Sequence, residues 1–168
     1  MLFSSIEFLY YFLPIVLIGY FLLPKQLRNG WLLLVSLVFY AWGEPKLVWV
    51  MLCSIVLNWL WGIGIGRSEK LLWKRFFLVL SCLTCLGLLG WFKYADFAFE
   101  NINALLGTAI PLPKLILPIG ISFYSFQILS YTIDVYRGHA ETQYNIIDFG
   151  CYVVLFPQLI AGPIVRYV

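Results

Sequence analysis

The chain has 168 residues, of which 62% are hydrophobic, 19% aromatic and only 11% charged. Soluble domains carry about 25% charged residues, so the composition excludes an ordinary soluble domain and predicts a protein built for lipid. The formal net charge of +3 is small, and because no basic block suggests nucleic acid, we expect no such partner.

The first half of the chain alternates apolar stretches with charged or turn-forming breaks. Phe8–Leu23 is apolar, contains Pro14 and ends at the basic break Pro24–Asn29. Trp31–Trp42 is apolar but short for a full crossing, and a Gly-Glu-Pro-Lys sequence follows it as a strong helix stop. Leu47–Ile65 is a convincing span of ordinary length.

The second half contains three further apolar stretches. After a dense basic loop, Phe76–Phe92 is predicted to return through the membrane. Lys93–Lys114 is the most polar interval, and the loose helical spacing of its apolar residues fits an amphipathic segment at the membrane surface. Leu115–Tyr136 is an apolar span with embedded polar residues, and Ile146–Ile160 is a final apolar stretch broken by Pro157.

These stretches predict an all-α integral membrane protein with about five to six transmembrane helices, some of them broken or re-entrant. No internal repeat or linker divides the chain, so residues 1–168 are expected to form a single polytopic domain. The first residues include Glu7 and no basic residue, so we expect the first span to be retained rather than cleaved as a signal peptide.

Basic residues predict the orientation of the chain. If the N-terminus lies outside, alternate loops place the following basic residues inside: Lys25, Arg28, Arg67, Lys70, Lys74, Arg75 and Arg137. The smaller group outside is Lys46, Lys93, Lys114 and Arg166. This asymmetry favours an N-terminus outside, because cytoplasmic loops of membrane proteins are enriched in Lys and Arg.

Polar residues inside the fifth apolar span are the main candidates for a functional site. Gln127, Ser130, Tyr131 and Asp134 are spaced so that one helical face collects them. Such a stripe in hydrocarbon indicates either a substrate pathway or a packed helix interface. Asp134 is open to two interpretations, a channel residue or an i,i+3 ion pair with Arg137.

Gln127 and three polar residues further along the chain have separate interpretations. Gln127 either orients an acyl carbonyl, binds a carbonyl of a broken helix or joins helices. Gln158 and Arg166 flank an Ala-Gly-Pro sequence where a broken helix would expose backbone groups toward a cavity. His139, the only histidine, stands in a polar turn-like loop and is expected to be a solvated surface residue.

Small residues in the spans have simpler interpretations. Gly62 and Gly66 form a small-x-x-x-small pattern, which predicts close helix packing rather than a nucleotide loop. Cys82 and Cys85 have Cys-x-x-Cys spacing without a second pair, so we expect apolar packing residues and no metal site.

Four segments carry a resemblance to a known family. They are Phe3–Leu9, Ser36–Pro45, Leu117–Arg137 and Phe156–Arg166. Together they resemble the membrane-bound O-acyltransferase (MBOAT) family in its alginate O-acetyltransferase branch. The resemblance implies an enzyme of the cytoplasmic (inner) membrane that uses a thioester donor, acetyl-CoA or an acyl carrier, with no bound cofactor. It also implies a polysaccharide acceptor outside the membrane and an extracytoplasmic acetyltransferase partner.

The same resemblance implies that the catalytic machinery is incomplete in these 168 residues. The family's catalytic histidine lies well downstream of the Gly-Pro-Ile-Val-Arg motif, and His139 does not occupy its place. We therefore expect no catalytic residue here, and no transfer without the remainder of the acyltransferase. The expected substrate-binding residues are Gln127, Tyr131, Asp134, Arg137, Gln158 and Arg166. The alternative function is a non-enzymatic membrane scaffold or a small transporter module.

Overall fold

The chain is mainly helical in the parts that its computed structural model describes, residues 5–107, 111–113, 115–161 and 167. No β-strand occurs among these residues, so the all-α prediction is confirmed. The elements are η1 (Phe8–Phe12), α1 (Leu13–Leu22), α2 (Lys25–Gly43), α3 (Val48–Arg67), α4 (Leu71–Leu106), α5 (Ile121–Arg137), α6 (Ile146–Val154) and α7 (Phe156–Ala161).

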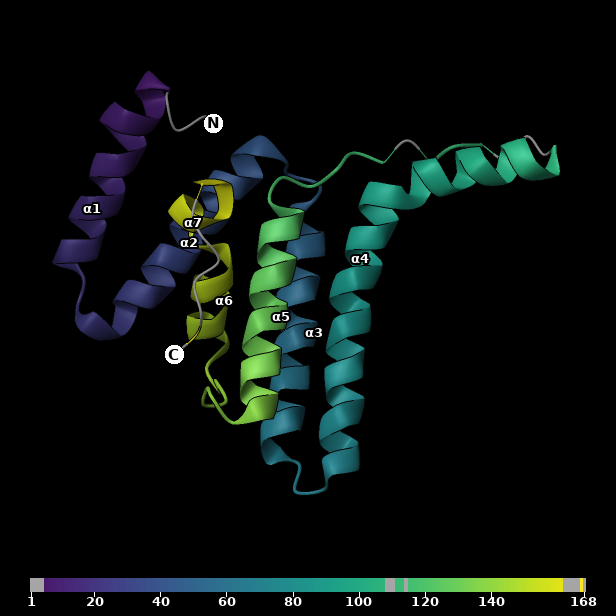
Figure 1. The fold of residues 1–168 in the computed structure, drawn as a ribbon. Coiled ribbons are helices and arrows are strands. Elements are labelled where there is room, and N and C mark those ends of the chain that lie inside the picture. The colour runs from purple at the N-terminus through teal and green to yellow at the C-terminus, as the bar shows by residue number, and fades with distance from the viewer. Residues whose placement is uncertain (1–4, 108–110, 114, 162–166, 168) are drawn as a thin grey trace.

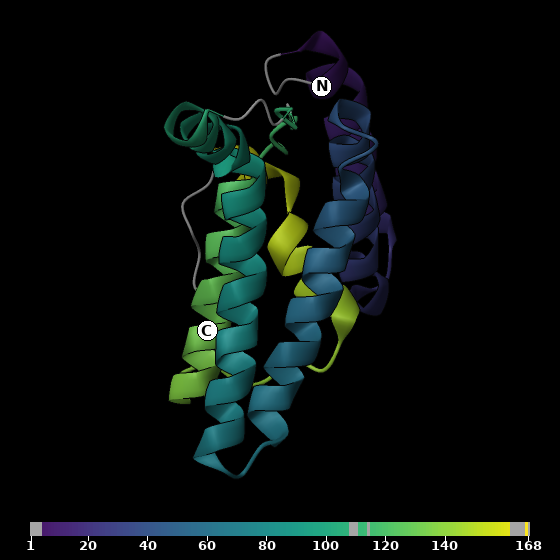
Figure 2. The ribbon, with the colours of Figure 1, turned by 90° about the vertical axis from the view of Figure 1, so that its right-hand side faces the viewer.

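Helices α3, α4 and α5 stand side by side as the centre of the fold (Figure 1). The turned view places α6 and α7 between α5 and the α1–α2 pair (Figure 2). Helices α3 and α4 are long and apolar enough to cross a membrane, and Phe8–Leu22 is a shorter apolar helix. The predicted total of five to six crossings remains a prediction.

The N-terminal helices differ from the expected spans at Pro14 and at the start of α2. Pro14 has no N–H, and the chain accommodates it at the first turn of α1, directly after a π-helical turn. Helix α2 is longer than the short stretch Trp31–Trp42, because the basic break after Pro24 forms its first turns. Trp31 fixes this hairpin, since its indole Nε1 donates to the carbonyl of Val16 over 3.1 Å.

Helix α4 runs well beyond the predicted span Phe76–Phe92 at both ends. It has 36 residues and ends at Gly107, whose φ of 62° lies in the left-handed region. Most of the polar interval that follows Phe92 is therefore helical, as the spacing of its apolar residues indicated. Figure 1 shows that the last part of α4 bends away from the bundle and runs across its axis. Gly87 and Gly90 precede this part, and glycines are a common cause of helix bends.

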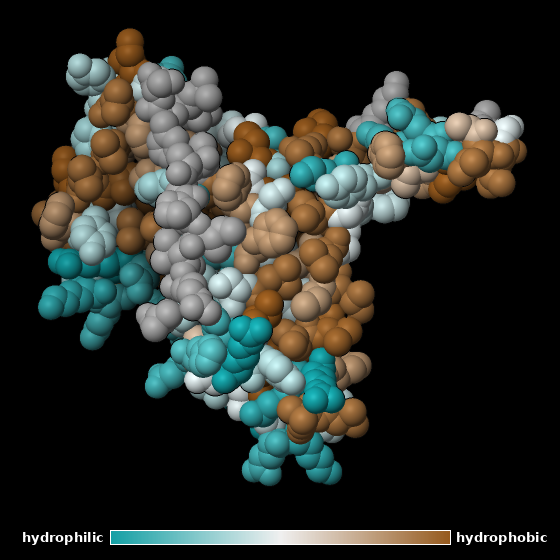
Figure 3. All heavy atoms as spheres, in the orientation of Figure 1, coloured by the Kyte–Doolittle hydropathy of each residue, from teal (hydrophilic) through white to brown (hydrophobic). Residues whose placement is uncertain are grey.

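The basic residues of the helix connections gather at one end of the bundle. Lys25 and Arg28 lie at the α1–α2 turn, Arg67 to Arg75 at the α3–α4 loop, and Arg137 at the end of α5. The surface view shows hydrophilic residues at these lower ends and a hydrophobic flank on α4 above them (Figure 3). We call this the basic end of the bundle.

Glycines on α3 allow the central helices to approach closely. A Cβ added to Gly62 would lie 3.0 Å from Cε1 of Tyr131 on α5, and one at Gly66 would collide with Thr142. The expectation that both glycines serve packing agrees with these contacts.

Replacing Gly62 with valine is expected to destabilise the protein by about 1–3 kcal/mol, because the added side chain overpacks against Tyr131. Gly87→Val is the matched control, since a Cβ there meets nothing within 4 Å. Unfolding in detergent at increasing dodecyl sulfate measures both variants. Equal losses at the two glycines would contradict the packing role of Gly62.

Candidate functional site

The polar stripe of α5 lies inside the bundle. Gln127, Tyr131 and Asp134 are 2%, 0% and 3% exposed, and all three belong to the single uninterrupted helix α5. Gly120 (φ 72°) starts this helix, and a side chain there would meet Leu159 of α7 at 3.0 Å. The stripe is therefore covered by neighbouring helices, and its chemistry depends on the partners that they supply.

Gln127 contacts the break between α6 and α7. Its Nε2 donates to the carbonyl oxygen of Tyr152 over 2.6 Å. That carbonyl belongs to the last turn of α6, where helix carbonyls lack a partner in their own helix. On the other side of the break, the N–H of Phe156 donates to Oγ of Ser36 on α2 over 3.3 Å.

These two contacts come from different helices and bind backbone groups on the two sides of the break. Pro157 in the first turn of α7 has no N–H, so a continuous helix would lack a hydrogen bond there. Gln127 thus has, in this structure, one of the roles considered for it from the sequence, a bond to the carbonyl of a broken helix. It positions the segment that follows α6.

A polar pocket of about 420 Å³ opens at the basic end, beyond the last turn of α5. Its lining is His139, Ala140, Glu141, Thr142, Gln143 and Tyr167. The buried hydroxyl of Tyr131 reaches this segment, because it accepts the backbone N–H of Gln143 over 2.9 Å. The side-chain amide of Gln143 donates to the hydroxyl of Tyr167 over 2.6 Å. We call this the inner pocket.

Asp134, the last residue of the stripe, contacts a residue that lines the inner pocket. Gly138 ends α5 with a φ of 75° and turns the chain back, so that the His139 N–H donates to the Asp134 carbonyl over 2.9 Å. Nδ1 of His139 then lies 4.0 Å from Oδ1 of Asp134. Arg137 is exposed, and the described contact of the Asp134 carboxylate is with His139, which pairs with it as an ion only when the ring is protonated.

His139 is the member of this pair that meets solvent. Its side chain is 62% exposed, as expected for a loop residue, whereas that of Asp134 is 4% exposed. The ring lines the mouth of the inner pocket.

The remaining candidates lie elsewhere. Gln158 is half-buried on α7, which packs against α2 and the start of α5. Arg166 lies outside the described residues. The structure thus brings Gln127, Tyr131 and Asp134 together along α5, and Tyr131 and Asp134 contact two residues that line the inner pocket, Gln143 and His139.

Comparison with known proteins addresses the resemblance directly. The chain is 40% identical to the probable alginate O-acetylase AlgI of Pseudomonas aeruginosa, over 99% of the chain and 33% of that protein. It is 40% identical to the protein of the same name from Azotobacter vinelandii, over 99% of the chain and 34% of the relative. The resemblance is confirmed: this chain is similar to the amino-terminal part of alginate O-acetylases.

A second kind of acetyltransferase matches the same residues. The peptidoglycan O-acetyltransferase of Helicobacter pylori is 32% identical over 99% of the chain and 37% of its own length. The chain therefore spans about one third of the length of the curated relatives that it matches. No family profile and no solved structure matches it.

The acetylase-like chain also contains a polar cluster that we did not anticipate from the sequence. Oγ of Ser81 on α4 donates to Oδ1 of Asn58 on α3 over 2.7 Å and lies 3.0 Å from Oγ1 of Thr132 on α5. Cys85 approaches the same Asn58 oxygen at 3.6 Å. All four are fully buried. Asn58 and Ser81 interrupt apolar runs, so the rule that singled out the stripe of α5 would also have found them.

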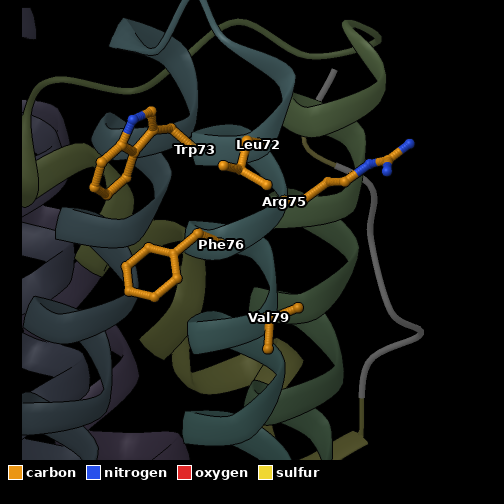
Figure 4. A pocket seen from close by; sticks show the side chains of 5 residues that line it. All are labelled: Leu72, Trp73, Arg75, Phe76 and Val79. Carbon is orange, nitrogen blue, oxygen red and sulfur yellow. The ribbon is translucent and has the colours of Figure 1, made fainter.

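Apolar hollows on the outer flank of α4 are a different kind of surface. One of about 480 Å³ is lined by Leu72, Trp73, Phe76 and Val79, with Arg75 at its edge (Figure 4). It contains none of the candidate residues of α5. Among the described residues, no three His, Cys, Asp or Glu side chains gather in a way that would hold a metal ion. The four cysteines are free thiols, and Cys85 and Cys151 are buried.

Proposed function

We propose that this chain is the amino-terminal part of a membrane-bound O-acyltransferase. The enzyme would carry an acyl group, most simply acetyl, from a cytoplasmic thioester to hydroxyls of a polysaccharide outside the inner membrane. The observation that carries the proposal is the 40% identity over 99% of the chain to alginate O-acetylases. The match to a peptidoglycan O-acetyltransferase supports acetyl transfer to glycans, with the acceptor polymer differing between relatives.

The distribution of charge supports an orientation with the N-terminus outside. The basic end of the bundle would face the cytoplasm, because Lys and Arg are enriched in cytoplasmic loops. The inner pocket lies at that same end, so a thioester donor with an anionic carrier would meet Arg67 and Arg137 near the pocket. Arg67 is held there, since its guanidinium lies 5.7 Å from the ring centre of Tyr144.

Within this proposal, the polar residues of α5 support the segments that border the path of the thioester donor. Tyr131 and Asp134 orient the segment that lines the inner pocket, Gln127 positions the broken helix, and Gln158 and Arg166 are assigned to substrate binding. A histidine of the remaining part of the enzyme would take the proton of the attacking hydroxyl. The hydroxyl oxygen then bonds to the thioester carbonyl carbon, and the thiol leaves with a proton. An extracytoplasmic acetyltransferase partner would complete delivery to the polymer.

Membranes given acetyl-CoA with a labelled acetyl group test the proposal. We expect membranes of cells with the intact gene to label glycan or protein, and membranes of the deletion strain to lose that label. The 168 residues expressed alone in the deletion strain are expected to restore none of it, because the family's histidine is missing. Undiminished labelling in the deletion strain would overturn the proposal and favour a scaffold or transporter.

A further inference from the structure

The bent end of α4, Trp91–Leu106, projects from the bundle and is called the arm below. At 1.5 Å per residue the 36 residues of α4 extend about 54 Å, whereas a hydrocarbon core is about 30 Å thick. A straight α4 would carry its last turns far beyond the bilayer. The bend instead keeps the arm near the level of the helix ends, opposite the basic end (Figure 1).

The arm has one apolar and one polar face. At about 100° per residue, one arc collects Trp91, Tyr94, Phe99, Ile102, Leu105 and Leu106. The opposite arc holds Lys93, Asp96, Glu100 and Asn103. Figure 3 shows hydrophilic residues on the upper side of the arm and hydrophobic residues on the side that faces the level of the spanning helices.

The apolar face is uncovered in the described protein. Ala95 is the last buried residue of α4, and beyond it Leu105 and Leu106 are 84% and 71% exposed. Leaving such side chains in water costs about 1.5–3 kcal/mol each relative to burial. A surface that is parallel to the arm and apolar beneath it would remove this cost.

We propose that the arm lies in the outer leaflet, with its apolar face in the acyl-chain boundary and its polar face among the headgroups. Trp91 and Tyr94 are the first aromatic residues of the arm, and tryptophan and tyrosine are favoured at membrane interfaces. The arm carries one Lys against one Asp and one Glu, so attraction to anionic lipid does not hold it. It needs none, because its covalent link to α4 keeps it at the surface and burial of apolar area suffices. The arm thereby fixes the depth of α4 in the bilayer.

Fluorescent labels on single cysteines test the arm in proteoliposomes. Glu100→Cys and Leu105→Cys place the label on opposite faces, in a Cys53→Ser background that removes the exposed native thiol. We expect lipids with a nitroxide near the headgroup end of the acyl chain to quench the Leu105 label roughly threefold more than the Glu100 label. Lipids with the nitroxide at the chain end are expected to quench both weakly.

Two results would overturn the inference. Equal quenching on both faces would mean that the arm is not oriented by lipid, and no quenching on either would mean that water or protein covers the apolar face. The inference rests on the membrane placement in the proposed function, but not on acyl transfer. Intact acetyl labelling with an unquenched arm would therefore reject the inference alone, whereas a quenched arm without acetyl labelling would reject only the proposed reaction.

Discussion

The Asn58→Leu variant is expected to unfold more easily than the unmodified protein, by about 1–2 kcal/mol. The cluster joins the three central helices, since Ser81 on α4 donates to Oδ1 of Asn58 on α3 and lies beside Thr132 on α5. The Nδ2 of Asn58 donates within α3, to the carbonyl of Ser54 over 2.8 Å. Leucine fills a similar volume but leaves Ser81 and Cys85 without this acceptor in a water-free interior. The loss is limited because Ser81 retains Thr132 as a neighbour at 3.0 Å.

A double-mutant cycle isolates the interaction from the change in volume. Asn58→Leu, Ser81→Ala and the double variant are compared by unfolding in mixed micelles, and we expect a coupling energy of about 1 kcal/mol. Val56→Ala is the control on the lipid-facing side of α3, where the side chain is 41% exposed. Additive effects of the Asn58 and Ser81 substitutions would show that the cluster does not join the helices.

Gln127→Leu is expected to cost about 1–3 kcal/mol of stability and to loosen the break between α6 and α7. The substitution removes the amide that donates to the carbonyl of Tyr152 over 2.6 Å, in the last turn of α6. In the full enzyme of the proposed function, the rate of acetyl transfer is expected to fall about tenfold. This factor corresponds to an increase of about 1.4 kcal/mol in the activation free energy when the segment after α6 is misplaced.

Hydrogen exchange at the break gives a readout that is independent of activity. We expect faster exchange at Phe156 in Gln127→Leu, and a similar increase in Ser36→Ala, which removes the acceptor of the Phe156 N–H. Ser125→Ala is the matched control on α5: this hydroxyl is buried, and none of the described residues accepts or donates a hydrogen bond to it. If Ser125→Ala and Gln127→Leu had the same effect, the role of Gln127 as a cap of the break would be wrong.

Helix α4 illustrates what sequence patterns predicted only in part. The spacing of apolar residues after Phe92 correctly indicated an amphipathic segment, but the polar residues were interpreted as the end of the span. No proline or glycine occurs between Phe92 and Gly107. The helix therefore continues past Phe92 and changes direction instead. In the same way, the basic residues after Pro24 interrupt the hydropathy pattern without interrupting helix α2.

For the candidate site, too, the local spacing of residues predicted the helix but not the contacts that its polar side chains make. Spacing alone placed Gln127, Tyr131 and Asp134 on one helix, and α5 is continuous over all three. Their contacts in the structure, at Tyr152, Gln143 and His139, come from segments after α5. Asp134 was open to a channel role or a pair with Arg137, and the left-handed turn at Gly138 adds His139 as a neighbour that the spacing did not indicate.

The sequence by itself determined the apolar, all-helical character of the chain, the polar face of α5 and the relatives that it resembles, because composition and a 3.6-residue period are local properties of the chain. Only the tertiary structure decided what each polar group binds: the break between α6 and α7 capped by Gln127 and Ser36, the cluster around Asn58, and the direction of the arm. The physical reason is that a buried hydrogen bond needs a partner at a fixed distance, and packing of remote segments alone sets that distance.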